Sequence, residues 1–145
     1  MVFSKSCEYG IKAAIYIASQ SLKRRRVSLK EIAEKIDSPI AFTAKILQIL
    51  VRNNIIDSTK GPVGGFQIER GRMDEVKLSH IVSAIDGDAV FRGCGLGLKE
   101  CDANRPCPVH DRFARIRGKL RTMLENTSLY ELSNGLEVGV TFLKR

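Results

Sequence analysis

The chain has 145 residues, of which 43% are hydrophobic and 28% are charged, a balance typical of a globular protein with one core. Its apolar runs fall short of the ~20 residues that cross a membrane, and its first residues do not form a signal peptide. We therefore expect a cytoplasmic protein with no membrane partner. The 24 Lys and Arg residues exceed the 16 Asp and Glu residues, and the resulting net charge of +8 favours a polyanionic partner.

The N-terminal third of the chain predicts three helices. Apolar residues spaced by four, three and four predict a helix over residues 5–22. Ser28 and Glu31 have the spacing of a capping box, which opens a second helix that ends near Pro39. The third helix is predicted from Pro39 or Ile40 to about Asn53, with a buried stripe of Phe42, Ile46, Ile49 and Leu50.

A β-hairpin is predicted directly after these helices. The hydrophobic period changes to two, which indicates strands over residues 55–59 and 66–68, joined by the glycine-rich turn 60–65. Helices followed by a hairpin in this order are typical of a winged helix-turn-helix. We therefore expect a mainly α protein with a small β-hairpin wing, in which residues 1–75 bind DNA.

A helix-turn-helix reads DNA with its second helix, which lies in the major groove while other groups hold phosphates. That helix is residues 39–53 here, and the glycine-rich tip of the wing is expected to enter the minor groove. The basic turn 23–26 is either a phosphate contact or a solvated turn. The candidate DNA-binding residues are Ser28, Ala41, Thr43, Lys45, Gln48, Thr59, Lys60 and Gly61.

The C-terminal half predicts a linking helix within residues 76–92 and a longer helix within the region 108–133. The longer helix carries an apolar seam with steps of four, three, four and three, which is typical of a helix that packs on a partner helix. Packing on its own domain is the alternative, and we expect a homodimer. Residues 134–145 alternate in hydropathy and form either an edge strand or a loose tail. The seam consists of Val109, Phe113, Ile116, Leu120 and Met123.

Three of the four cysteines lie in a glycine- and proline-rich loop, residues 93–108, with six and then five residues between them. Zinc ribbons and fingers use closer pairs, whereas iron–sulfur clusters need thiolates that converge from a flexible loop. We favour a cluster; a thiol switch, a structural zinc site and inert packing are the alternatives. The fourth ligand is open between His110, near the loop, and Glu8 or Cys7 of a partner subunit. The loop cysteines are Cys94, Cys101 and Cys107.

The wing segment, residues 55–66, and the three-cysteine loop together resemble the Rrf2 family of bacterial transcription regulators, over roughly residues 1–133. The resemblance implies a homodimer, built on the long helix, that reads a palindromic site in double-stranded DNA. It implies that a cluster controls DNA affinity, and we expect a repressor that senses iron, nitric oxide or redox state. His110 resembles the fourth ligand of a 2Fe–2S cluster in one branch of the family. Glu8 resembles a 4Fe–4S ligand, supplied by the partner subunit, in another branch.

The chain also departs from this family pattern. Ala44 stands where one branch has a glutamate that helps select its sites, and Lys60 stands where an arginine usually enters the minor groove. The operator sequence is therefore expected to differ. Other members work without a cluster, through a protein partner, and an electron-transfer or cluster-carrier protein is a rival from another class. An enzyme is not expected, because the sequence lacks paired carboxylates, a nucleophile–base pair and a phosphate-binding loop.

Overall fold

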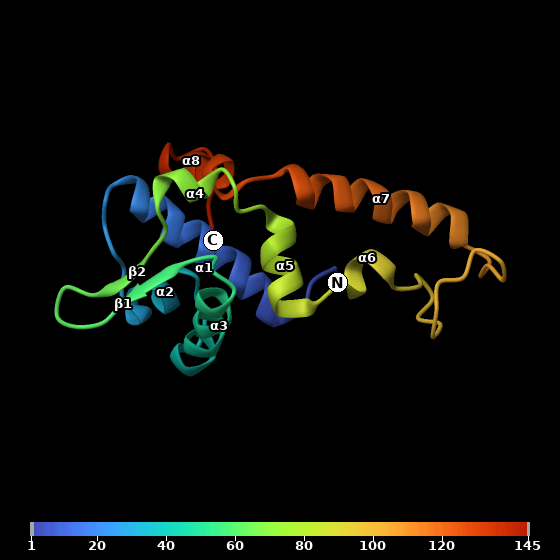
Figure 1. The fold of residues 1–145 in the computed structure, drawn as a ribbon, viewed down its shortest axis with the longest axis horizontal. Coiled ribbons are helices and arrows are strands. Elements are labelled where there is room, and N and C mark those ends of the chain that lie inside the picture. Colours follow the sequence, from blue (N-terminus) through green and yellow to red (C-terminus); the bar gives the residue numbers. More distant parts are fainter. Residues whose placement is uncertain (1, 145) are drawn as a thin grey trace.

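The computed structural model describes residues 2–144 and shows eight helices and a two-stranded hairpin. Figure 1 shows a globular body on one side and a long arm, made of α6, the cysteine loop and α7, on the other. The elements in chain order are α1 (Lys5–Leu22), α2 (Leu29–Lys35), α3 (Ile40–Arg52), β1 (Asp57–Thr59), β2 (Gly65–Gln67), α4 (Arg70–Met73), α5 (Leu78–Asp86), α6 (Ala89–Arg92), α7 (His110–Asn126) and α8 (Leu129–Glu137).

Helix α1 forms the centre of the body. It packs against α2, α3, α5, α8 and the second strand of the hairpin. Its middle residues are buried on all sides, because small alanines allow the neighbouring helices to approach while Ile17 fills the space between them. Ser4 caps the helix by accepting a hydrogen bond from the Cys7 amide at 3.0 Å. The predicted start and end of this helix are confirmed.

The turn into α2 contains half of the expected capping box. The Ser28 hydroxyl accepts a hydrogen bond from the Glu31 amide at 3.2 Å, as expected for an N-cap. The Glu31 carboxylate does not bond back to the cap, because it bonds instead to Tyr16 and Arg25. The serine therefore starts the helix, while the glutamate ties α2 to α1 and to the preceding turn.

The wing is a short antiparallel pair, β1 and β2, with Ser58 opposite Phe66. Val27, two residues before α2, joins the hairpin through an isolated β-bridge: Val27 and Phe66 exchange backbone hydrogen bonds of 3.1 and 2.8 Å. Gly65 has a φ of +136°, and a Cβ at this position would lie 2.7 Å from the Val27 carbonyl oxygen. Only glycine allows this close approach, so the glycine-rich turn serves the packing of the wing on the body.

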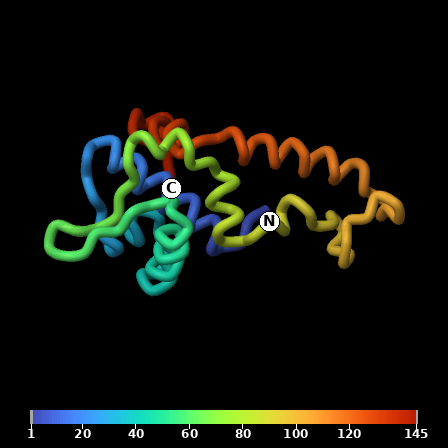
Figure 2. Tube along the Cα trace, in the orientation of Figure 1, coloured from blue at the N-terminus to red at the C-terminus, as the bar shows by residue number. Residues whose placement is uncertain are grey.

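The arm leaves the body after α5 and returns along α7, as the trace in Figure 2 shows. The start of α5 and the end of α7 meet at one place in the body, where Leu78 donates to the Thr127 carbonyl at 3.0 Å and Leu129 donates to the Val76 carbonyl at 2.9 Å. Leu124, which is 0% exposed, secures the end of α7 in the core. The segment 93–109 between α6 and α7 has no helix or strand.

Two short helices were not predicted, and the C-terminus is only partly a tail. Helices α4 and α6 have four residues each, too short for a hydrophobic period to reveal them. Ser128 caps α8, which extends to Glu137, so residues 134–137 are helical and not part of a tail. Residues 138–144 form no strand, which leaves the loose tail of the two alternatives.

Candidate DNA-binding face and cysteine loop

The predicted recognition helix, α3, exposes most of the expected side chains and buries one. Ala41, Lys45 and Gln48 are exposed and Ala44 is half-buried. Thr43 is only 1% exposed, and its hydroxyl donates to the Pro39 carbonyl at 2.8 Å. The prediction that Thr43 faces DNA is therefore wrong, because the hydroxyl is used inside the first turn of the helix.

A groove of about 410 Å³ separates the exposed face of α3 from the wing. Gln48 and Arg52 lie on the helix side, and Ser58 and Lys60 lie on the hairpin side. The structure thus brings together residues that the sequence assigned to two separate elements. Thr59, Lys60 and Gly61 are exposed at the end of the hairpin. Ser28, the N-cap of α2, is exposed as well.

Two of the four cations of the basic turn 23–26 pair with carboxylates, and the other two lie beside the wing. Lys23 pairs with Glu137 at 3.2 Å and Arg25 pairs with Glu31 at 3.1 Å. Arg24 and Arg26 instead lie beside the tip of the wing, where Arg26 Nη1 donates to the Val63 carbonyl at 3.4 Å. Within residues 2–144 these two arginines make no ion pair, so their charges extend the cationic surface to the wing.

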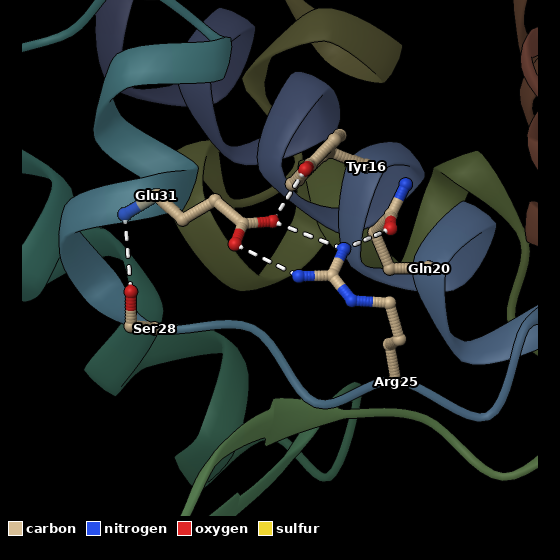
Figure 3. A network of polar contacts seen from close by, with 5 residues as sticks. All are labelled: Tyr16, Gln20, Arg25, Ser28 and Glu31. Carbon is tan, nitrogen blue, oxygen red and sulfur yellow. Dashed lines mark hydrogen bonds and ion pairs between the residues drawn. The ribbon is translucent and has the colours of Figure 1, made fainter.

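A polar network fixes the shape of this turn (Figure 3). The Tyr16 hydroxyl donates to Glu31 Oε2 at 2.5 Å, and Arg25 donates to both oxygens of that carboxylate and to the Gln20 amide oxygen. The hydrogen bond from Tyr16 and the Arg25 charge lower the pKa of Glu31. Burial, together with the neighbouring carboxylate, raises the pKa of Tyr16 to about 12. The carboxylate is thus held ionised between a neutral phenol and a guanidinium.

The loop cysteines lie in two pairs. Cys94 Sγ and Cys107 Sγ are 3.8 Å apart, while Cys101 Sγ lies 3.4 Å from His110 Nδ1. Backbone N–H groups of residues that follow Cys94 point at its sulfur and lower its pKa, which favours the thiolate. All three sulfurs are partly exposed, so they are open to a ligand or an oxidant.

Besides the Cys101–His110 pair, two further contacts attach the loop to α7. Gly95 lies flat on the Phe113 ring, since a Cβ there would be 2.3 Å from a ring carbon. The Arg117 guanidinium donates to Cys101 Sγ at 3.0 Å, to the Arg92 carbonyl at 3.2 Å and to the Gly93 carbonyl. The sequence analysis did not single out Arg117; its spacing of seven residues from His110 was the signal that both lie on one face of the helix.

The two N-terminal candidates for a fourth ligand lie on α1. Glu8 pairs with Lys5 at 3.3 Å. Cys7 is 0% exposed, and burial raises the pKa of its thiol to about 12. A buried, protonated thiol is not a metal ligand, so Cys7 is a core residue and is no longer a candidate.

Whether the loop suits an iron–sulfur cluster depends on the type of its donor atoms and on whether these atoms lie close enough together to share one cluster. Three thiols and one imidazole are the donor types that clusters use. Within residues 2–144, however, no group of three or more Cys, His, Asp or Glu side chains lies close enough to hold a metal ion, because the donors form two separate pairs. The donor set therefore fits in its chemistry, and the unstructured segment 93–109 supplies the freedom to bring the pairs together.

Comparison with known proteins decides the family. Residues 3–135 match the family model described as Rrf2, iron-dependent transcriptional regulator. The chain belongs to the Rrf2 family. It is 35% identical over 135 residues to the HTH-type regulator BadM of Rhodopseudomonas palustris, covering 91% of this chain and 81% of that protein. It is also 25% identical over 130 residues to IscR of Pectobacterium atrosepticum, covering 90% and 77%.

The fold comparison agrees with this assignment. The crystal structure of oxidised CymR from Staphylococcus aureus superposes with a TM-score of 0.71 at 25% identity, covering 92% of this chain and 96% of that one. The mainly α fold with a hairpin wing is thereby confirmed, and this Rrf2 protein is a DNA-binding transcriptional regulator. In the described residues, no helix is both long and apolar enough to span a membrane.

Proposed function

We propose that this Rrf2 protein is a cytoplasmic, homodimeric regulator, acting as a repressor, whose affinity for a palindromic operator depends on an iron–sulfur cluster. The observation that carries the proposal is the presence of two donor pairs, Cys94 with Cys107 and Cys101 with His110, in the flexible loop and at the start of α7. The family description, an iron-dependent regulator, and the similarity to IscR support it. When bound, a cluster would supply a centre that reacts to iron supply, nitric oxide or oxidants.

Four residues would bind the cluster: the three loop cysteines and a fourth ligand. Cys94, Cys101 and Cys107 would hold the cluster, and His110 is the fourth ligand that we favour, because its imidazole already lies beside Cys101. The family resemblance associates this ligand set with a 2Fe–2S cluster. The rival is Glu8 of the partner subunit with a 4Fe–4S cluster. His110→Ala and Glu8→Ala variants, compared for iron per chain after anaerobic reconstitution, separate the two.

The proposed dimer rests on the exposed seam of α7. Phe113 is 37% exposed, Ile116 60% and Met123 46%, although all three are apolar. Other positions on α7 pack on the protein's own chain: Leu124 is buried, Leu120 packs against the core, and Arg121 lies over the Phe91 ring at 4.9 Å. Part of α7 thus serves the body, and its exposed apolar residues are left for a second copy. Ile116→Glu should give a monomer in sedimentation, whereas Arg115→Glu, also on α7, should not.

DNA binding would use the groove between α3 and the wing in each subunit. The proposed base-reading residues are Ala41, Lys45 and Gln48, with Lys60 at the minor groove and Ser28 at a phosphate. Thr59 and Gly61 flank that lysine and would follow it into the minor groove. Because half-sites lie ~34–36 Å apart or at multiples of that distance, a small change in the dimer contact alters how both α3 helices fit. The cysteine loop contacts α7, the helix that would carry the proposed dimer contact.

The test is anaerobic purification followed by measurement of iron, sulfide and visible absorption, and then of operator affinity with and without the cluster. We expect coloured protein with near-stoichiometric iron and sulfide, and a different affinity for the two forms. Cys101→Ala should lose both the cluster and the regulation. Colourless protein after reconstitution, or equal affinity of the two forms, would overturn the proposal.

A cluster-free thiol regulator is the second candidate. It is favoured by the 3.8 Å contact of the Cys94 and Cys107 sulfurs, which a mild oxidant could join, and by the similarity to CymR, which crystallises in an oxidised form. In that case Cys94→Ser would abolish the response to peroxide while iron content stays at zero in the unmodified chain.

A further inference from the structure

Arg117 occupies a position that none of the roles above uses. It lies on α7 and its guanidinium donates to three acceptors of the cysteine loop: Cys101 Sγ and the carbonyls of Arg92 and Gly93. Gly93 immediately precedes Cys94. One side chain therefore connects the approach to the first cysteine with the second cysteine.

We propose that Arg117 is the positioning residue of the cysteine loop: it fixes the loop on α7 and donates an N–H bond to the sulfur of Cys101, which retains a cluster and tunes its potential. Only the retention of the cluster and the tuning of its potential rest on the proposed function; the fixing of the loop on α7 does not. Hydrogen bonds to ligand sulfurs stabilise the more negative, reduced form of a cluster and raise its reduction potential. A guanidinium is suited to this task, since its planar fork offers five N–H donors in fixed directions.

The neighbouring contacts explain why a single residue matters here. The loop has no helix or strand, and Leu96 and Leu98 within it are each 55% exposed, so few buried contacts hold it in place. Besides Arg117, the described loop contacts with α7 are Gly95 on the Phe113 ring and the pair of Cys101 with His110. Removing the guanidinium frees both the segment before Cys94 and the Cys101 sulfur at once.

The proposal predicts a change in the apo protein that requires no cluster. Trypsin should cleave after Lys99, which is exposed in the loop, severalfold faster in Arg117→Ala than in the unmodified chain. Arg115→Ala is the matched control, because Arg115 lies on the same helix and donates only to the Asp111 carbonyl of that helix. Equal cleavage of the two variants would refute the holding role, even if the protein never takes up iron.

The second measurement uses the reconstituted protein. Arg117→Ala should lose its cluster to a chelator ~10–100-fold faster, as for other partners of metal ligands, and should have a lower reduction potential. Arg117→Lys should not restore either property, because one ammonium cannot span the three acceptors. Iron and sulfide in the unmodified chain test the proposed function separately. If that chain holds a cluster and Arg117→Ala matches it in retention and potential, the tuning role is wrong.

Discussion

Replacing Tyr16 by Phe removes one oxygen atom from the network that shapes the basic turn. The hydroxyl donates to Glu31 Oε2 at 2.5 Å, and Tyr16 itself is buried on α1. A hydrogen bond to a charged group contributes ~1.5–3 kcal/mol. Glu31 is half-buried and keeps its contacts with Arg25, so the lower half of this range applies. We expect Tyr16→Phe to destabilise the fold by ~1.5–2 kcal/mol, or ~3–8 °C in Tm.

The same network fixes the pH dependence of this effect. The pKa of Glu31 is lowered from its ordinary value of 4.5, so its contribution is present above that value and is lost as the pH falls through the lower, folded pKa. The pKa of Tyr16 is raised from 10.0 to about 12, so its contribution is complete below pH 10 and is lost as the pH rises from 10 to 12. The difference between the unmodified chain and Tyr16→Phe should therefore be largest between these limits.

Urea unfolding at several pH values measures this difference. Tyr9→Phe is the matched control, because the Tyr9 ring packs on Phe42 at 5.6 Å while its hydroxyl makes no hydrogen bond among residues 2–144. The control should change the unfolding free energy by less than ~0.5 kcal/mol. Two results would refute this reasoning: equal stability of the two variants, or an effect of Tyr16→Phe that does not change between pH 8 and 12. Either would show that the hydrogen bond from Tyr16 to Glu31 does not stabilise the fold.

Three further substitutions test the wing and the arm. Gly64→Ala should destabilise the fold by ~1–3 kcal/mol and weaken operator binding, because the new Cβ would lie 2.2 Å from the Thr59 carbonyl oxygen. Gly71→Ala is the control, since its Cβ would meet nothing within 4 Å, and equal melting curves of the two variants would contradict this. Lys60→Ala should weaken binding to all sequences and lower the slope of log affinity against log salt by ~1 in band-shift titrations; an unchanged slope would place the lysine away from phosphate. Gly118→Ala, which adds a methyl in open space on α7, should stabilise the fold by ~0.5–1 kcal/mol in calorimetry, and a lower Tm would indicate an unrecognised contact.

The DNA-binding half of the fold could be predicted from the sequence because each element carries a local signal. Hydrophobic periods of 3.6 and 2 and the cap at Ser28 gave α1, α3 and the order of the hairpin close to their observed bounds. Thr43 was misplaced because a threonine can use its hydroxyl inside its own helix, and polarity alone does not reveal that. Leu47 was absent from the predicted buried stripe of this helix, although it is fully buried beside that stripe.

The contacts of the arm depend on residues far apart in the chain, and the sequence analysis could identify only their donors. Three cysteines and His110 were found by residue type and spacing. Their division into two pairs follows from the path of the loop over α7, which no periodicity encodes. Arg117 was not singled out, because a charged residue on a helix gives no sign that a loop returns to it.

The junction at the base of the arm has a consequence for how such a protein can diversify. Two backbone hydrogen bonds join the start of α5 to the segment after α7, and α5 itself packs on α1 and α3 in the body. The arm that follows α5 is therefore an excursion that is closed at its base. Changes in the length or in the ligand residues of its outer loop therefore leave the proposed DNA-binding helices where they are. A lineage can exchange one chemical signal for another in this segment while its DNA-reading half continues to fold unchanged.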